Sequence, residues 1–191
     1  MTQSLSDIRA DIARQLAEGA ASRRSACHTP VVGTADADMR VMVLRAFDPD
    51  SWTLRFHTDA RSPKAQLIGE GAPAGVLFYD REAKVQMRCR GEGRIATQGE
   101  TVDAAWAAST NFARRCYLGA EPGAISDTPT SGLPDWAEGV QPTEEQVAPA
   151  REHFALLLVT LREVDWLYLS NEGHRRAVLQ VPAGEARWVT P

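Results

Sequence analysis

The stretch RVMVLRAFDPDSWTLRFHT, residues 40–58, decides the fold. Its first part, residues 40–47, is apolar on both alternating faces, which is typical of a strand buried on both sides. The Asp-Pro-Asp-Ser segment at 48–51 has the chemistry of a turn. Residues 52–58 then alternate between large apolar and polar side chains, as a half-buried strand does. The stretch therefore predicts a β-hairpin.

Further strand and helix patterns lie on both sides of this hairpin. Capping residues and helical spacing predict three helices, at 6–19, 62–69 and 100–114. Short apolar or alternating runs predict strands at 28–32, 74–79, 85–97, 154–161, 164–169, 177–181 and 187–189. Many strands with short helices between them predict an α+β, mainly β fold, a barrel of about six antiparallel strands rather than a doubly wound sheet.

The length of 191 residues fits an N-terminal helix, residues 1–24, followed by one domain, residues 25–191. Within that domain, residues 120–150 hold five of the eleven prolines and show no sustained period. They predict a long irregular loop that serves as a lid or as an arm between subunits.

The composition excludes several classes of protein. Apolar residues make up 43% and charged residues 24%, so a sizeable core is expected, and the net charge of −4 argues against a general nucleic-acid binder. No apolar run approaches the ~20 residues that a membrane helix needs, and the N-terminus lacks the pattern of a secretory signal. Three scattered cysteines form no C-x-x-C motif, which indicates a reducing, cytoplasmic compartment.

Basic and hydroxyl side chains stand at the ends of the predicted strands. No glycine-rich nucleotide motif, nucleophile elbow or zinc spacing is present, and the four histidines stand far apart, so no metal site is expected. An arginine and a lysine beside hydroxyls at a helix start suit a phosphate monoester. The other interpretation is that these are solvated surface charges. The residues concerned are Arg40, Arg45, His57, Thr58, Ser62 and Lys64.

Taken in order, these segments resemble the pyridoxamine 5′-phosphate oxidase family of FMN-binding split barrels, over roughly residues 25–191. The resemblance rests first on Arg40-Val-Met-Val-Leu-Arg45, Phe56-His57-Thr58, Ser62-Pro63-Lys64 and Val85-Gln86-Met87-Arg88 with Gly91. It continues in Val164-Asp165-Trp166-Leu167, His174-Arg175-Arg176 and the terminal Trp188-Val189-Thr190-Pro191. Three positions depart from the family pattern, because His57 replaces a tyrosine, Pro63 replaces an arginine and Arg45 replaces a lysine.

The resemblance implies a homodimer with flavin mononucleotide (FMN) at the interface. Arg40 and Lys64 would hold the FMN phosphate, with Thr58 and Ser62 donating hydrogen bonds to it. Gln86 would bind the polar edge of the flavin ring, and Arg176 of the partner subunit would approach the ring or its ribityl chain. Trp166 is the best aromatic candidate for a flavin contact. The strand that would lie along the ring comprises Val41, Met42, Val43, Leu44 and Arg45.

The resemblance also implies an FMN-dependent oxidoreductase that acts on a small-molecule substrate or electron donor. Its flavin does the redox chemistry, so no acid–base residue is assigned. The family's substrate-gripping arginine is replaced by Glu172, whose carboxylate would repel a phosphate dianion. We therefore do not expect pyridoxamine phosphate itself as the substrate. The alternatives are a non-enzymatic flavin-binding or storage module, and a split barrel that binds haem or a deazaflavin.

Overall fold

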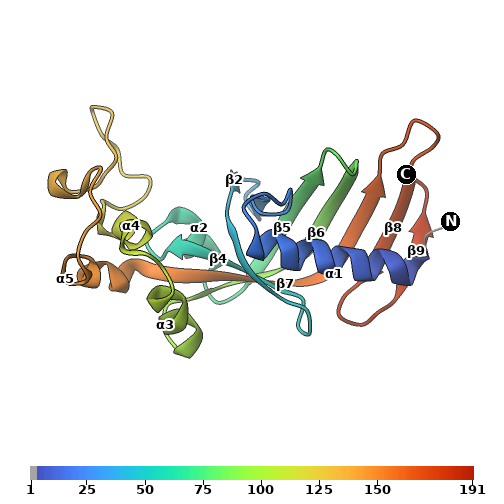
Figure 1. Ribbon diagram of the computed structural model, residues 1–191, viewed down its shortest axis with the longest axis horizontal. Coiled ribbons are helices and arrows are strands. Elements are labelled where there is room, and N and C mark those ends of the chain that lie inside the picture. The colour runs from blue at the N-terminus through green and yellow to red at the C-terminus, as the bar shows by residue number, and fades with distance from the viewer. Residues whose placement is uncertain (1–3) are drawn as a thin grey trace. The chain divides into compact units, whose positions relative to one another are not determined.

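The computed structural model describes residues 4–191, and it is a mainly antiparallel β-sheet with flanking helices (Figure 1). This confirms the predicted α+β split-barrel class. Within the described residues, nine strands form one sheet, in the order β2-β1-β5-β6-β7-β4-β3, with β8 pairing with β7 and β9. The strands are β1 (Val31–Thr34), β2 (Met39–Val41), β3 (Leu44–Asp48), β4 (Thr53–Asp59), β5 (Ala72–Asp80), β6 (Val85–Ala96), β7 (Phe154–Tyr168), β8 (Arg175–Gln180) and β9 (Ala186–Val189).

The chain divides into two compact units. Unit 1 comprises the described part of Met1–Phe56 together with Gly71–Arg94 and Leu158–Pro191, and unit 2 comprises His57–Glu70 and Ile95–Leu157. Among residues 4–191, no helix is both long and apolar enough to cross a membrane.

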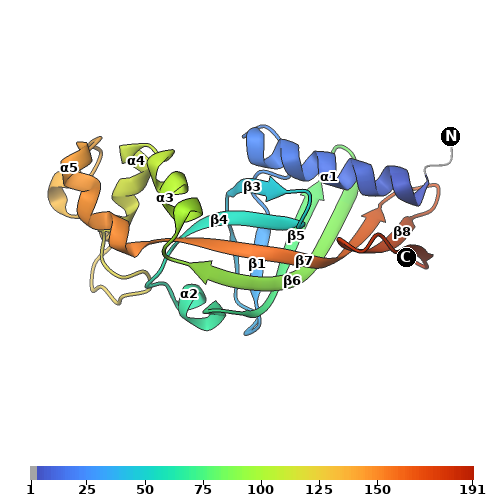
Figure 2. The same cartoon turned by 90° about the horizontal axis from the view of Figure 1, so that it is seen from below.

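In unit 1 the N-terminal helix α1 (Leu5–Ala21) packs on β3 and β9 (Figures 1 and 2). Its apolar stripe of Ile8, Ile12 and Leu16 is fully buried, as the four-residue spacing requires. The helix begins two residues earlier than the predicted Ser6 cap would place it. Ser4 is the N-cap, and its side chain and that of Asp7 form a reciprocal capping box.

The predicted hairpin is present, but the prediction for its first strand is wrong in one respect. β3 and β4 are antiparallel, with Leu44 opposite Phe56. However, residues 40–47 do not form one strand buried on both sides: the chain breaks at 42–43 into β2, which pairs with β1, and β3, which pairs with β4. Val41 is 65% exposed, so β2 is not buried on both sides.

Unit 2 carries the shorter helices and an aromatic cluster. Phe154 is fully buried, and the rings of His57, Trp106 and Tyr117 lie 5.0, 5.3 and 5.2 Å from its centroid. The helices of unit 2 are α2 (Pro63–Ile68), α3 (Glu100–Ala107), α4 (Asn111–Arg114) and α5 (Glu144–Val147), with 3-10 turns η1 (Arg115–Leu118), η2 (Asp135–Ala137) and η3 (Ala148–His153). α2 confirms the predicted helix, with Pro63 at its first position.

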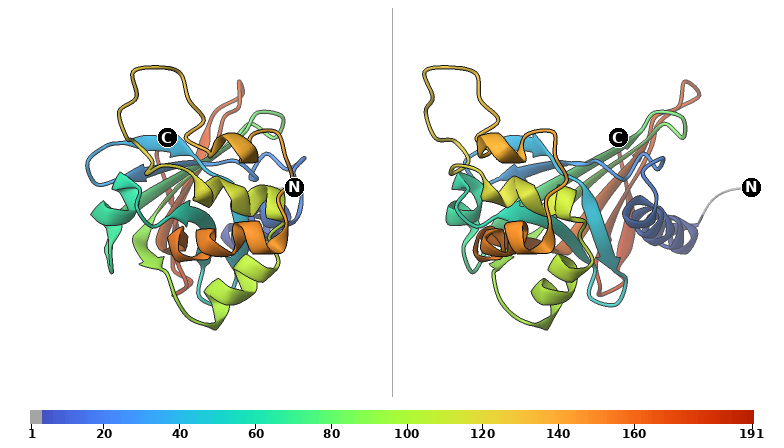
Figure 3. Two further views of the ribbon diagram at one scale, coloured as in Figure 1. Left: turned by 90° about the vertical axis from the view of Figure 1, so that its left-hand side faces the viewer. Right: turned by 60° about the vertical axis from the view of Figure 1, so that its left-hand side comes forward.

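Three further predictions differ from the structure. The 100–114 helix is broken, because Thr110 accepts a hydrogen bond from the Ala113 amide and so caps a new helix, α4. The 120–150 stretch is irregular only in part, since it contains η2 and α5 (Figure 3). The strands predicted at 154–161 and 164–169 are one strand, β7, because the charged pair between them, Arg162 and Glu163, forms ion pairs with Glu92 and Arg90 of β6.

Candidate functional site

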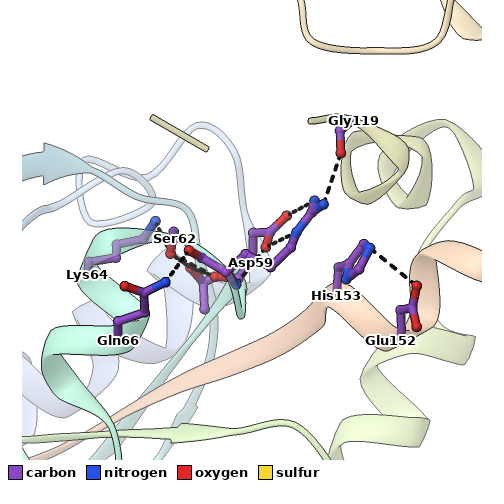
Figure 4. A network of polar contacts seen from close by, with 9 residues as sticks. Asp59, Ser62, Lys64, Gln66, Gly119, Glu152 and His153 are labelled. Carbon is purple, nitrogen blue, oxygen red and sulfur yellow. Dashed lines mark hydrogen bonds and ion pairs between the residues drawn. The ribbon is translucent and has the colours of Figure 1, made fainter. Parts of the chain in front are cut away.

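The turn between β4 and α2 gathers hydroxyl and ammonium groups in unit 2 (Figure 4). The Ser62 hydroxyl donates to the carbonyl of Asp59 at 2.7 Å, and Thr58 Oγ1 lies 3.5 Å from Ser62 Oγ. Lys64 Nζ donates to the same Ser62 oxygen at 3.2 Å. Thr58 and Ser62 are buried, at 4% and 1% exposure. The structure therefore brings three predicted phosphate-binding side chains, Thr58, Ser62 and Lys64, into one hydrogen-bonded group.

Arg61 lies in the same turn but serves a different purpose. Its backbone amide, Nε and Nη2 all donate to the Asp59 carboxylate, at 2.7–3.0 Å, and Nη1 donates to the carbonyl of Gly119 at 3.1 Å. In Figure 4, Ser62 and Lys64 lie on one side of Asp59 and Gly119 lies on the other. Burial acts to raise the pKa of Asp59, but the hydrogen bonds from Arg61 outweigh it and hold that pKa below its usual value. Arg61 thus connects the turn to residue 119. Its donors are engaged there, so Arg61 does not supply the guanidinium that the family pattern has at the position of Pro63.

His57, which stands where the family has a tyrosine, packs edge-on against Phe154 at 5.0 Å. Its ring belongs to the aromatic cluster of unit 2, so His57 packs as an aromatic side chain does.

Arg40 is held within unit 1 by the β1–β2 hairpin. Its Nη1 donates to Thr34 Oγ1 at 3.1 Å and to the carbonyl of Val32 at 3.4 Å, and its guanidinium forms an ion pair with Asp38. Asp38 is mostly exposed, and an ion pair with an exposed carboxylate contributes little stability. Along the rest of the predicted ring-binding strand, Met42 and Leu44 are buried, Val43 is half-buried and Arg45 is exposed.

The outer face of unit 1 is defined here as the side of β2, β1, β5 and β6 that carries Val41, Leu77, Tyr79, Gln86 and Arg88. In the ladder register, Val41 and Leu77 both lie opposite Val31, Leu77 lies opposite Arg88, and Tyr79 lies opposite Gln86. Directly opposite residues share a face of the sheet. Val41, Leu77 and Tyr79 are 65%, 38% and 50% exposed. Two predicted flavin contacts, Val41 and Gln86, thus share an apolar, open face.

A buried carboxylate joins two arginines on this face. Asp165 of β7 is 1% exposed, accepts from Arg176 Nε at 2.9 Å and Nη2 at 2.8 Å, and forms a second ion pair with Arg88. Burial alone would raise the pKa of Asp165, but the two arginines more than offset this and lower it. Arg176, another predicted flavin contact, therefore lies on the same face as Arg88, on β8, which pairs with β7.

Trp166 lies on the opposite side of the sheet. Successive residues of a strand point to opposite faces, so Trp166 faces away from Asp165 and Arg176. It is 4% exposed, stacks on Tyr168 at 6.3 Å, and lines a cavity of about 890 Å³ between the C-terminal half of α1, residues 22–27 and the β5–β6 turn. The structure does not bring Trp166 together with the other predicted residues of unit 1.

Sequence reasoning missed Asp59, Arg88 and Asp165 as parts of the site. The signal for Asp165 was present, because a carboxylate within an otherwise apolar strand must find a cationic partner. Its partners come from β6 and β8, which are distant in sequence, so spacing alone did not identify them.

Comparisons with known proteins agree with this geometry. Residues 14–97 match the model of the pyridoxamine 5′-phosphate oxidase FMN-binding domain. Among solved structures, a pyridoxamine 5′-phosphate oxidase-related FMN-binding protein from Nostoc punctiforme PCC 73102 is similar over 98% of this chain and 100% of that one, with a TM-score of 0.69 and 24% identity.

Two more distant structures share the fold. PhzG from Burkholderia lata 383, in complex with tetrahydrophenazine-1-carboxylic acid, is 15% identical, with a TM-score of 0.59 over 96% of this chain and 88% of that one. The general stress FMN/FAD binding protein from Xanthomonas citri is 14% identical, with a TM-score of 0.52 over 87% and 92%. No curated protein matches the sequence.

Proposed function

We propose that this chain is an FMN-binding oxidoreductase of the pyridoxamine 5′-phosphate oxidase-related group of split barrels, because residues 14–97 match the model of that family's FMN-binding domain. The observation that carries the proposal is which residues the family model matches. Residues 14–97 include Arg40, Thr58, Ser62, Lys64 and Gln86, the residues assigned to the FMN phosphate and ring.

The chemistry of these residues fits FMN. In unit 2, two hydroxyls and an ammonium come from Thr58, Ser62 and Lys64. In unit 1, Arg40 offers a guanidinium whose partner, Asp38, is exposed. Phosphate binding to such groups is charge-assisted. The outer face offers apolar side chains for a flat ring and an amide, Gln86, for its polar edge. When bound, FMN supplies hydride or electron transfer, while these residues bind and orient it.

The outer face also supports a homodimer. Its exposed Val41, Leu77 and Tyr79 form a continuous apolar area flanked by Gln86 and Arg88, and apolar centres with polar rims are typical of protein–protein interfaces. We propose that a second copy of the chain covers this face, with FMN at the interface.

Replacing Val41 and Leu77 together by aspartate is expected to convert the dimer to a monomer. Each buried, unpaired carboxylate at an interface costs about 3–5 kcal/mol. Size-exclusion chromatography with light scattering measures the change in mass. The control is Ile125→Asp, because Ile125 is 99% exposed in unit 2 and its change should leave the mass unaltered. A double variant that stays dimeric would show that the interface lies elsewhere.

Reduction of the bound flavin separates an oxidoreductase from a storage module. We expect NADH or NADPH, mixed anaerobically with the FMN-loaded protein, to bleach the flavin absorbance, and air or another acceptor to restore it. Dithionite provides the fully reduced reference. A flavin that dithionite reduces but neither nucleotide does would favour the module.

Glu172, exposed in the turn between β7 and β8, fits a substrate without a phosphate dianion.

A further inference from the structure

The buried carboxylate of Asp165 organises the cationic part of the outer face. It receives both Nε and Nη2 of Arg176, each carboxylate oxygen accepting one bond, and its Oδ2 also pairs with Arg88. Two parallel bonds from the guanidinium fork fix the plane of Arg176 as well as its position. Since the side chain of Asp165 is 1% exposed and anchored on a central strand, it is a rigid support.

The N–H groups of Arg176 that do not donate to Asp165, chiefly those of Nη1, are the ones available to a ligand. A guanidinium has five N–H donors, and Asp165 takes two of them. Nη1 has one long contact, 3.4 Å to the carbonyl of Thr190, an exposed residue near the end of the chain. The Arg176 side chain is 28% exposed, so part of it is accessible to a ligand.

No other carboxylate of the strand takes over this role. Glu163, two residues earlier on the same face of β7, is already engaged by Arg90 and by Gln180 Nε2, at 3.0 Å. Without Asp165, Arg176 and Arg88 would be two adjacent cations with nothing between them. They would repel each other, and Arg176 would lose its fixed orientation.

We propose that Asp165 is a positioning residue that orients the Nη1 edge of Arg176 toward bound FMN. This inference rests on the proposed FMN binding. Asp165 itself makes no contact with the flavin in this proposal, because its carboxylate acts through Arg176. Arg88 pairs with the same carboxylate.

The test is a double-mutant cycle read out as FMN affinity, measured by quenching of FMN fluorescence on binding. Asp165→Asn and Arg176→Ala are each expected to weaken FMN binding about tenfold, as one lost charge-assisted contact does. The double variant is expected to bind no more weakly than Arg176→Ala alone, because both changes remove the same contact. Glu163→Gln is the matched control and should leave the affinity unchanged.

Arg176→Lys tests the same idea while leaving Asp165 in place and keeping a cation beside it. Lysine keeps the charge but lacks the planar fork that Asp165 holds, so its FMN affinity should fall as far as that of Arg176→Ala. This variant decides the matter if Asp165→Asn does not fold.

Three results would overturn the inference. Losses that multiply in the double variant would show that Asp165 acts independently of Arg176. A folded Asp165→Asn protein with wild-type affinity, or an Arg176→Lys protein with wild-type affinity, would show that the orientation of the fork is not needed. Failure of the wild-type protein to bind FMN is a separate outcome, because it would overturn the proposed function itself.

Discussion

Replacing Arg40 and Lys64 together by alanine is expected to weaken FMN binding at least a hundredfold and to give a colourless protein. Each side chain is proposed to make a charge-assisted hydrogen bond to the FMN phosphate, worth about 1.5–3 kcal/mol. The loss of both amounts to two or more factors of ten in the dissociation constant. Fluorescence titration with FMN measures the change, and the flavin absorbance of the purified protein gives an independent reading.

The control for this variant removes the same charges elsewhere. Arg23→Ala combined with Lys84→Asn takes away one arginine and one lysine, both exposed. Asparagine is chosen because Lys84 has a φ of 55°, a left-handed conformation that asparagine tolerates better than alanine. The control should bind FMN as the wild type does. Equal loss in both variants would assign the effect to net charge, and retention of FMN by the Arg40 and Lys64 variant would remove these residues from the phosphate site.

Gly91→Ala is expected to destabilise the fold by about 3 kcal/mol or more, the upper range for forcing atoms into a packed interior. A Cβ at position 91 would overlap the carbonyl of Thr160 and lie 2.9 Å from Leu161 Cα. Both are backbone atoms of β7, the neighbour of β6 in the sheet, so no side chain can rotate away. The melting temperature of the variant should fall by roughly 10 °C for a chain of this size.

A second glycine on the same sheet serves as the control for position 91. A Cβ at Gly75 would meet only the carbonyl of Cys89, at 4.0 Å, which is an ordinary contact. Gly75→Ala should therefore shift the melting temperature by no more than about 1 °C, as a neutral surface change does. A stable Gly91→Ala protein would mean that β6 and β7 are not as closely spaced as described.

Local chemistry made much of the fold predictable. The Asp-Pro-Asp-Ser turn and the alternation after it were sufficient for the β3–β4 hairpin, and Ser62-Pro63 was sufficient for the start of α2. Hydrophobic spacing was sufficient for α1. These features depend on residues that are close together in the sequence.

Features that depend on distant residues were not predictable. The apolar run at 40–47 indicated burial on both sides, but Val41 of β2 is exposed in this chain, and an apolar pattern alone does not tell which of its residues the rest of the fold covers. The charged pair at 162–163 indicated a break in β7, although its partners on β6 hold the strand together. Asp165 likewise acquires its role only when β6 and β8 lie beside β7.

The most direct test of the central claim is the absorption spectrum of the purified protein before and after incubation with FMN and removal of the excess. The account predicts a yellow protein with flavin absorbance that is retained after gel filtration and lost in the Arg40→Ala, Lys64→Ala double variant. A colourless protein that takes up no FMN, or one that shows a Soret band of haem instead, would contradict it.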